Sequence, residues 1–307
     1  MTVGIHPSAY RLPEEARIGR VRLQVSDLTR SLAYYTDVLG FTASIRAGGI
    51  AVLATGDGVP LVELHERKGS RPVPRRGRLG LYHFAILLPD RQTLGRFLAH
   101  LGEVGAYAGS ADHLVSEALY LADPDGLGVE VYADRPRAEW KTNGREIAMA
   151  TEPLDLRGLV RAGGDGRWAG MPAGTTIGHV HFHVPTLREA EAFYHSGLGF
   201  DKVVWSFPGA VFFSVGGYHH HVGTNVWAAD APVATAQDAR LIEWELQLPG
   251  KDGIASAAAS AARAGYQIHE AGDDRLITDP TGIIVRLTTE GATREHDSHR
   301  DDNDVQH

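Results

Sequence analysis

The amino-acid sequence predicts an α+β protein built from four βαβββ modules that form two pseudo-repeated domains. Two pairs of similar segments indicate this duplication. VSDLTRSLAYYTDVLGF (25–41) resembles VPTLREAEAFYHSGLGF (184–200), and ADPDGLGVEVY (122–132) resembles TDPTGIIVRLT (278–288). The members of each pair are 159 and 156 residues apart. Because the offset is nearly constant, we expect both halves of the chain to share one architecture.

Each half divides again into two modules. Alternating apolar residues predict four leading strands: IGRVRLQVSD (18–27), GLYHFAILLPD (80–90), IGHVHFHVPT (177–186) and RLIEWELQLPG (240–250). A helix is expected after each one, at 27–39, 90–104, 186–197 and 251–265. Shorter strands are expected at 50–55, 60–65, 118–122, 127–133, 209–215, 218–227 and 283–289.

The modules define the expected domain boundaries. Modules one and two form an N-terminal domain (18–134), and modules three and four form a C-terminal domain (177–290). The segment 135–176 mixes Gly, Pro and Trp, which indicates a partly ordered connector. The polar tail 291–307 is expected to be disordered.

Composition limits the class of protein. The chain has 307 residues, of which 43% are hydrophobic and 22% charged, as in globular proteins. A net charge of −8 argues against nucleic acid as a partner. The chain lacks cysteine, which excludes disulfides, thiolate ligands and a thiol nucleophile. No segment has the pattern of a signal peptide or a membrane span, so we expect a cytoplasmic protein without a membrane partner.

The repeated helix pattern, D-L-x-x-[S/A] followed by an aromatic-Tyr pair and Leu-Gly-Phe, resembles that of the vicinal oxygen chelate superfamily over roughly 18–289. Within it, GLYHFAILLP, IGHVHFHV and GGYHHHVGTNVW resemble the two-domain extradiol ring-cleaving dioxygenases of the catechol 2,3-dioxygenase group. The resemblance implies a small aromatic diol and O2 as substrates and a muconic semialdehyde-type product. It implies Fe(II) as cofactor, with Mn(II) as an alternative, and allows a homo-oligomer.

In this superfamily each module offers two inward positions, and two modules together enclose one cavity. Modules two and three offer His83, Glu130, His179 and His220. Modules one and four offer Arg20, Glu63, Glu243 and Arg286, which would pair with one another and repel a metal. If the modules paired as one with two and three with four, each cavity would bring an arginine into the ligand set. We therefore predict that modules two and three pair.

His83, Glu130 and His179 match the metal-ligand positions of the extradiol pattern. Two imidazoles and one carboxylate form the facial triad of non-heme Fe(II) oxygenases. A single histidine on a strand is more often a core or surface residue. The joint occurrence of all three residues at equivalent positions favours a metal site.

Three further residues are candidates for catalysis. Strand alternation makes His220 point away from His219 and His221, and the resemblance places His220 at the acid/base position. His221 remains the alternative inward residue. The resemblance also assigns Tyr120 to a hydrogen bond with a metal-bound oxygen and His113 to the substrate hydroxyl. The spacing from His113 to Tyr120 is shorter than in better-known enzymes of the class.

The roles of two further histidines remain open, and so do two alternatives to the dioxygenase function. His181 and His183 share the strand parity of His179 and are expected behind or beside the ligands. A metal-dependent isomerase or lyase would normally carry a second carboxylate where this chain has His220. A metal-free binding protein would not need two histidines and a glutamate at ligand positions. Leu127 and Gly128 replace a Gly-Asn-Gly turn of relatives, which predicts only a local change.

Overall fold

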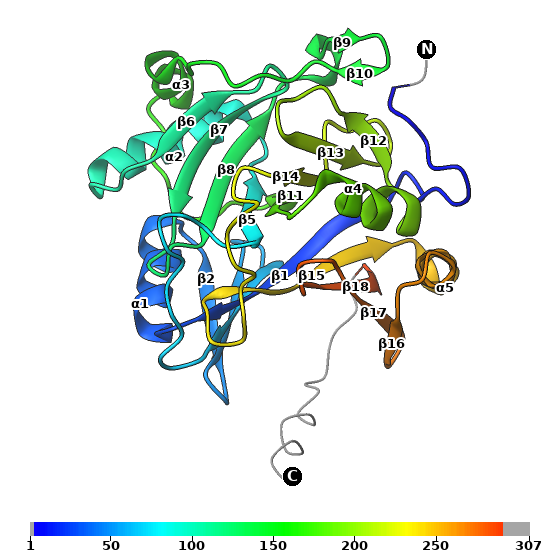
Figure 1. Ribbon diagram of the computed structural model, residues 1–307. Coiled ribbons are helices and arrows are strands. Elements are labelled where there is room, and N and C mark those ends of the chain that lie inside the picture. Colours follow the sequence, from blue (N-terminus) through cyan, green and yellow to red (C-terminus); the bar gives the residue numbers. More distant parts are fainter. Residues whose placement is uncertain (1–2, 291–307) are drawn as a thin grey trace.

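The computed structural model describes residues 3–290, so the predicted disordered tail (291–307) lies outside the described residues. Within the described range, two eight-stranded mixed sheets and one two-stranded sheet form the architecture (Figure 1). This arrangement confirms the predicted α+β class of paired βαβββ modules.

One large sheet joins modules two and three. Module two contains β5 (Gly80–Leu87), α2 (Arg91–Glu103), β6 (Gly109–Asp112), β7 (Ser116–Ala122) and β8 (Gly128–Asp134). Module three contains β11 (Thr176–His183), α4 (Leu187–Ala190), the π-helical turn η3 (Glu191–Gly197), β12 (Asp201–Val204), β13 (Ala210–Ser214) and β14 (Val222–Asn225). The strand order is β12-β13-β14-β11-β5-β8-β7-β6, with β5 and β11 antiparallel at the centre.

The other large sheet joins modules one and four. Module one contains β1 (Arg17–Val25), α1 (Leu28–Ala33), the π-helical turn η1 (Tyr34–Val38), β2 (Thr42–Arg46), β3 (Ile50–Ala54) and β4 (Pro60–Glu66). Module four contains β15 (Arg240–Leu248), α5 (Gly250–Arg263), β16 (Ile268–Ala271), β17 (Asp274–Thr278) and β18 (Ile284–Thr289). The order is β16-β17-β18-β15-β1-β4-β3-β2, so the predicted pairing of modules is confirmed. Each sheet takes one module from each half, and the division into domains at 135–176 stays a prediction.

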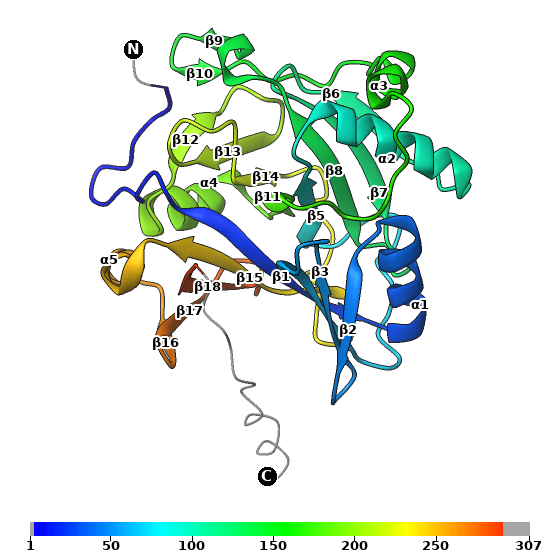
Figure 2. The ribbon, with the colours of Figure 1, turned by 180° about the vertical axis from the view of Figure 1, so that it is seen from behind.

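The segment between the halves contains η2 (Arg137–Glu139), β9 (Thr142–Asn143), β10 (Glu146–Ile147) and α3 (Leu156–Gly163). The two views of the ribbon place β9, β10 and α3 along the outer side of the sheet that joins modules two and three (Figures 1 and 2). Helix α3 packs closely on α2, since a Cβ at Gly95 would lie 2.2 Å from the carbonyl oxygen of Leu159.

Local sequence signals explain the helix ends. Asp27, Asp90 and Thr186 each accept a backbone N–H at the start of a helix. The Leu-Gly-Phe sequences end two of the helices because Gly40 and Gly199 adopt φ values of +84° and +95°.

The core lies on one face of the central strands and the histidines on the other. On β11, Val180 and Phe182 belong to the main hydrophobic cluster, while His179, His181 and His183 alternate with them. The opposite, histidine-rich face is therefore free to form a cavity.

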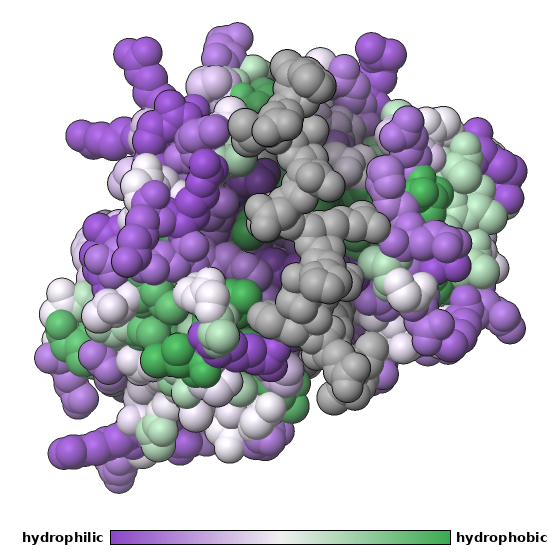
Figure 3. Space-filling view, turned by 90° about the horizontal axis from the view of Figure 1, so that it is seen from below, coloured by the Kyte–Doolittle hydropathy of each residue, from purple (hydrophilic) through white to green (hydrophobic). Residues whose placement is uncertain are grey.

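No helix among residues 3–290 is long and apolar enough to cross a membrane. One face of the surface carries mainly hydrophilic side chains with smaller apolar groups between them (Figure 3).

Candidate metal centre

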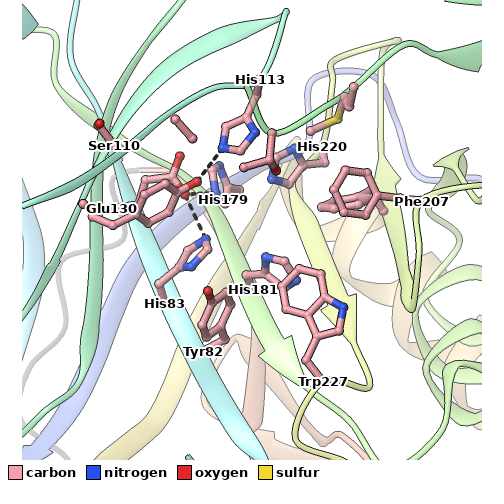
Figure 4. A pocket seen from close by; sticks show the side chains of 16 residues that line it. Tyr82, His83, Ser110, His113, Glu130, His179, His181, Phe207, His220 and Trp227 are labelled. Carbon is pink, nitrogen blue, oxygen red and sulfur yellow. Dashed lines mark hydrogen bonds and ion pairs between the residues drawn. The ribbon is translucent and has the colours of Figure 1, made fainter. Parts of the chain in front are cut away.

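Three neighbouring strands bring the predicted ligands together. His83 lies on β5, Glu130 on the parallel neighbour β8, and His179 on the antiparallel neighbour β11. Oε2 of Glu130 is 2.9 Å from Nε2 of His83 and 3.2 Å from Nε2 of His179 (Figure 4). A register shift between Ile177 and His179 accompanies this convergence. The exposed fractions are only 4%, 2% and 1%, so the triad is buried.

The spacing of these atoms suits a six-coordinate metal ion. Two ligand atoms at right angles, each about 2.1 Å from an ion, are separated by about 3.0 Å. The two measured separations lie on either side of this value. Nε2 of His83 also has no hydrogen-bond partner within the described residues, although the carboxylate oxygen is near. The donor set therefore fits a divalent cation, and His83, Glu130 and His179 form a buried metal-binding triad.

Burial and neighbouring charges keep the three ligands in the protonation states that metal binding requires. Burial lowers the pKa of His179 to about 4, so its imidazole is neutral at neutral pH, as metal ligation requires. Burial alone would raise the pKa of Glu130, but His179 and His83 hold this pKa well below its usual range. A buried carboxylate beside a neutral imidazole attracts a divalent cation.

A cavity of about 430 Å³ opens beside the triad. Besides the three ligands, its wall contains Tyr82, Gly109, Ser110, Ala111, His113, Tyr120, Met149, Thr151, His181, Phe207, Phe212, His220 and Trp227. Phe207 and Trp227 lie on the side away from Glu130 (Figure 4). Among residues 3–290, Glu130 is the one carboxylate in this wall, and neither lysine nor arginine contributes to it.

Tyr120 and His113 lie together in the cavity wall. Nδ1 of His113 is 2.7 Å from the carbonyl oxygen of Ala150, so it carries the proton and donates it there. In the neutral ring Nε2 then accepts, and the hydroxyl of Tyr120 donates to it at 2.6 Å. Burial raises the pKa of Tyr120 well above its usual value, with a further contribution from Glu130, which keeps this phenol protonated.

The three consecutive histidines differ from the strand prediction. The sequence predicts a strand over 218–227, but β14 begins only at Val222, after a turn in which Gly216 and Gly217 have positive φ. Strand alternation therefore does not apply to the triplet. His220 nevertheless lines the cavity, with its ring centroid 4.0 Å from that of His179. His221 instead lies 3.0 Å from the hydroxyl of Ser214 and is absent from the cavity wall.

Two other histidines lie along the same strand as His179. His181 lines the cavity, and its Nε2 accepts from the amide of Asn225 at 3.0 Å. Nδ1 of His183 donates to the amide oxygen of the same Asn225 at 2.6 Å. Sequence reasoning did not identify Met149 and Thr151, since they come from the connector and carry no motif.

The equivalent positions of the other sheet hold ion pairs. Arg286 contacts Glu243 through two hydrogen bonds of 2.7 and 2.9 Å. Arg20 and Arg22 lie 3.2 and 3.0 Å from the carboxylate oxygens of Glu63. These acids and guanidiniums pair with one another, as their types predict.

The fold and the triad define a metalloprotein of the paired βαβββ class, and comparison with known proteins agrees. Residues 17–131 match the sequence model described as the Glyoxalase/Bleomycin resistance protein/Dioxygenase superfamily. The chain is 43% identical over 272 residues to a catechol-2,3-dioxygenase from Bacillus subtilis (strain 168), covering 87% of this chain and 95% of that protein. The chain therefore belongs to the glyoxalase/bleomycin resistance protein/dioxygenase superfamily.

Two solved structures are similar in fold. One is a candidate dioxygenase from Bacillus subtilis subsp. subtilis strain 168, with a TM-score of 0.63 and 12% identity, covering 92% of this chain and 87% of that one. The other is glyoxalase I from Zea mays, with a TM-score of 0.54 and 16% identity, covering 90% of this chain and 92% of that one. At these identities the similarity concerns the fold alone.

Proposed function

We propose that the protein is an extradiol ring-cleaving dioxygenase, which inserts O2 into a catechol beside its two hydroxyl groups and releases a muconic semialdehyde-type product. The observation that carries this proposal is the buried triad of two histidines and one glutamate at the wall of an aromatic cavity. The 43% identity to a catechol-2,3-dioxygenase over most of both chains supports it.

Fe(II) is the proposed metal, and Mn(II) would suit the same donors. When bound by His83, Glu130 and His179, it would supply open coordination positions for two diol oxygens and O2. All three ligands are buried, so little of their own surface is exposed to solvent.

His220 is the proposed acid/base. Its ring lies against His179 and in the cavity wall, where a substrate hydroxyl would lie within reach. Burial, reinforced by neighbouring imidazoles, lowers the pKa of His220 well below its usual value. The ring is therefore neutral at neutral pH and can accept a proton from the diol and return it later.

Tyr120 and His113 are proposed to hold the reacting oxygens. The protonated phenol of Tyr120 can turn from His113 to donate to a developing negative charge, and Nε2 of His113 is then free for a substrate hydroxyl. The rings of Tyr82, Phe207 and Trp227 provide flat apolar walls for an aromatic ring.

The test is anaerobic reconstitution with Fe(II), addition of catechol, and then exposure to oxygen. A yellow ring-fission product that disappears in His83→Ala and His179→Ala, but persists in the exposed control His269→Ala, would support the proposal. Bound iron that disappears in both ligand variants, without a yellow product from catechol or alkylcatechols, would favour isomerase or lyase chemistry. Absence of metal binding in the unaltered protein would favour a metal-free binding protein.

A cytoplasmic location and the formation of a homo-oligomer are also part of the proposal. Analytical ultracentrifugation would test the oligomeric state.

A further inference from the structure

A hydrogen-bonded chain connects the cavity with the outside of the sheet through the histidine triplet. Nδ1 of His220 is 2.7 Å from Nδ1 of His219. Nε2 of His219 is 2.8 Å from Oδ1 of Asp134, the last residue of β8. His219 is fully buried, whereas the side chain of Asp134 is 26% exposed. His219 does not line the cavity, so the mechanism proposed above leaves this chain without a role.

The acceptor-only chemistry of the carboxylate determines where each proton lies. An ionised carboxylate only accepts, so Nε2 of His219 must donate to Asp134. In a neutral ring only one nitrogen carries a proton, and Nδ1 of His219 therefore accepts. The short contact between the two rings then requires Nδ1 of His220 to donate. The remaining nitrogen of His220, Nε2, is left with its lone pair.

We infer that Asp134 and His219 are positioning residues, which hold His220 in the tautomer whose Nε2 lone pair is available to the substrate hydroxyl. This inference rests on the proposed function, because it supplies the base which ring cleavage needs in its accepting form. Without the carboxylate, the histidine pair could adopt the reverse order, and Nε2 of His220 would carry a proton and donate.

Packing around His219 keeps this arrangement in place. Its ring lies 4.1 Å from the ring of Tyr218 and 5.3 Å from that of Trp140, measured between centroids. The hydroxyl of Tyr218 also donates to Asp134 at 3.2 Å. Neither His219 nor Asp134 can therefore turn away without breaking a hydrogen bond or a ring contact.

The test is nitrogen NMR of protein labelled with 15N-histidine, in the metal-free form and loaded with diamagnetic Zn(II). The signals of His220 and His219 are assigned by their loss in His220→Gln and His219→Gln. We expect His220 with a protonated Nδ1 and an unprotonated Nε2, and His219 with the opposite pattern. A protonated Nε2 on His220, or a doubly protonated His219 at neutral pH, would overturn the inference.

The variant Asp134→Asn tests whether the tautomer of His220 affects the rate of ring cleavage. We expect its NMR spectrum to have the reversed order, and kcat to fall about 100- to 10,000-fold with unchanged iron content. A retained order in Asp134→Asn, or a reversed order with full activity, would contradict the inference. Tyr218→Phe, which removes the other hydrogen bond to Asp134, is the matched variant and should keep the tautomer. If the unaltered protein has the expected tautomer but cleaves no catechol, the proposed function fails while the assignment of the protons stands.

Discussion

Gly178 lies directly against the phenol of Tyr132. A Cβ at position 178 would be 1.8 Å from the Tyr132 hydroxyl oxygen and 3.1 Å from Cβ of Leu87. Tyr132 is fully buried, its ring centroid is 5.0 Å from that of His179, and its hydroxyl meets that of Tyr218 at 2.8 Å. The glycine thus allows the residue next to it, His179, to pack against Tyr132.

Gly178→Ala should therefore disturb the metal centre as well as the fold. The added methyl group must displace the buried phenol, which should cost about 1–3 kcal/mol of unfolding free energy. Since Tyr132 supports the His179 ring, metal affinity should also fall. Denaturant unfolding and calorimetric titration with Zn(II) measure both effects. Gly102→Ala in α2, where a methyl group meets no atom within 4 Å, is the control and should slightly stabilise the helix. Equal metal affinity in both variants would refute the role of Gly178.

Glu130→Gln should remove most of the metal binding without a change of shape. The amide is neutral, so the ligand set loses its carboxylate. We expect metal affinity to fall by at least roughly 100-fold, equivalent to about 2.7 kcal/mol. Metal content after gel filtration and titration calorimetry check this. The exposed Glu139→Gln should bind as the unaltered protein does, and similar binding by both variants would argue against the triad.

Tyr120→Phe should lower turnover while leaving the metal in place. The change removes the hydroxyl that contacts His113 at 2.6 Å but keeps the ring. If this hydroxyl stabilises developing charge, kcat should fall roughly 100-fold with little change in iron content. Tyr107→Phe, at a 90% exposed position, provides the control. Unchanged kcat would leave Tyr120 as a packing residue only.

The pKa of Glu63 predicts how the stability of the metal-free protein changes at acidic pH. Burial alone would raise the pKa of Glu63, but the hydrogen bond from His65 and the charges of Arg22 and Arg20 lower it from 4.5 to about 2. A lowered carboxyl pKa means that the stabilisation is present above about pH 4.5 and is lost as the pH falls toward 2. This loss is on the order of 2 kcal/mol. In Glu63→Gln, the unfolding free energy should start lower at pH 6 and decline less steeply between pH 5 and 2. Denaturant unfolding across this pH range measures the change in unfolding free energy, with the exposed Glu103→Gln as the control. If the unfolding free energies of both variants change with pH in parallel, the lowered pKa of Glu63 is contradicted.

The absence of cationic side chains among the described residues of the cavity wall predicts a preference for neutral substituents on the catechol ring. Since no lysine or arginine of the part of the chain that the structure describes lines the cavity, a carboxylate on the ring would lose its hydration without gaining a partner. We expect kcat/KM for 4-methylcatechol to exceed that for 3,4-dihydroxybenzoate by roughly 100-fold or more, about 2.7 kcal/mol. Met149→Lys, which places a cation in the wall, should narrow this ratio. Comparable use of both substrates by the unaltered protein would contradict the prediction.

Much of the architecture could be predicted from sequence because its signals are local or repeated. The repeat and the alternation of apolar residues identify the four modules, and the residue types at equivalent positions predict which modules pair. An arginine beside a glutamate forms an ion pair, whereas two histidines and a glutamate form a ligand set. His83, Glu130 and His179 could be assigned in this way, and the structure brings all three within hydrogen-bonding distance.

Other features depend on contacts between distant parts of the chain. The turn at Gly216 and Gly217 ends the alternation that was expected for the histidine triplet, and positive φ at these glycines is a property of the folded backbone. The contact of His219 with Asp134 joins residues 85 positions apart, and Met149 reaches the cavity from a connector without any motif. The sequence by itself determines the modules and the chemistry of the ligands, because periodicity and residue type are local. Tertiary structure alone decides the directions of the three consecutive histidines 219–221 and the walls of the cavity, because these depend on which strands and loops pack against one another.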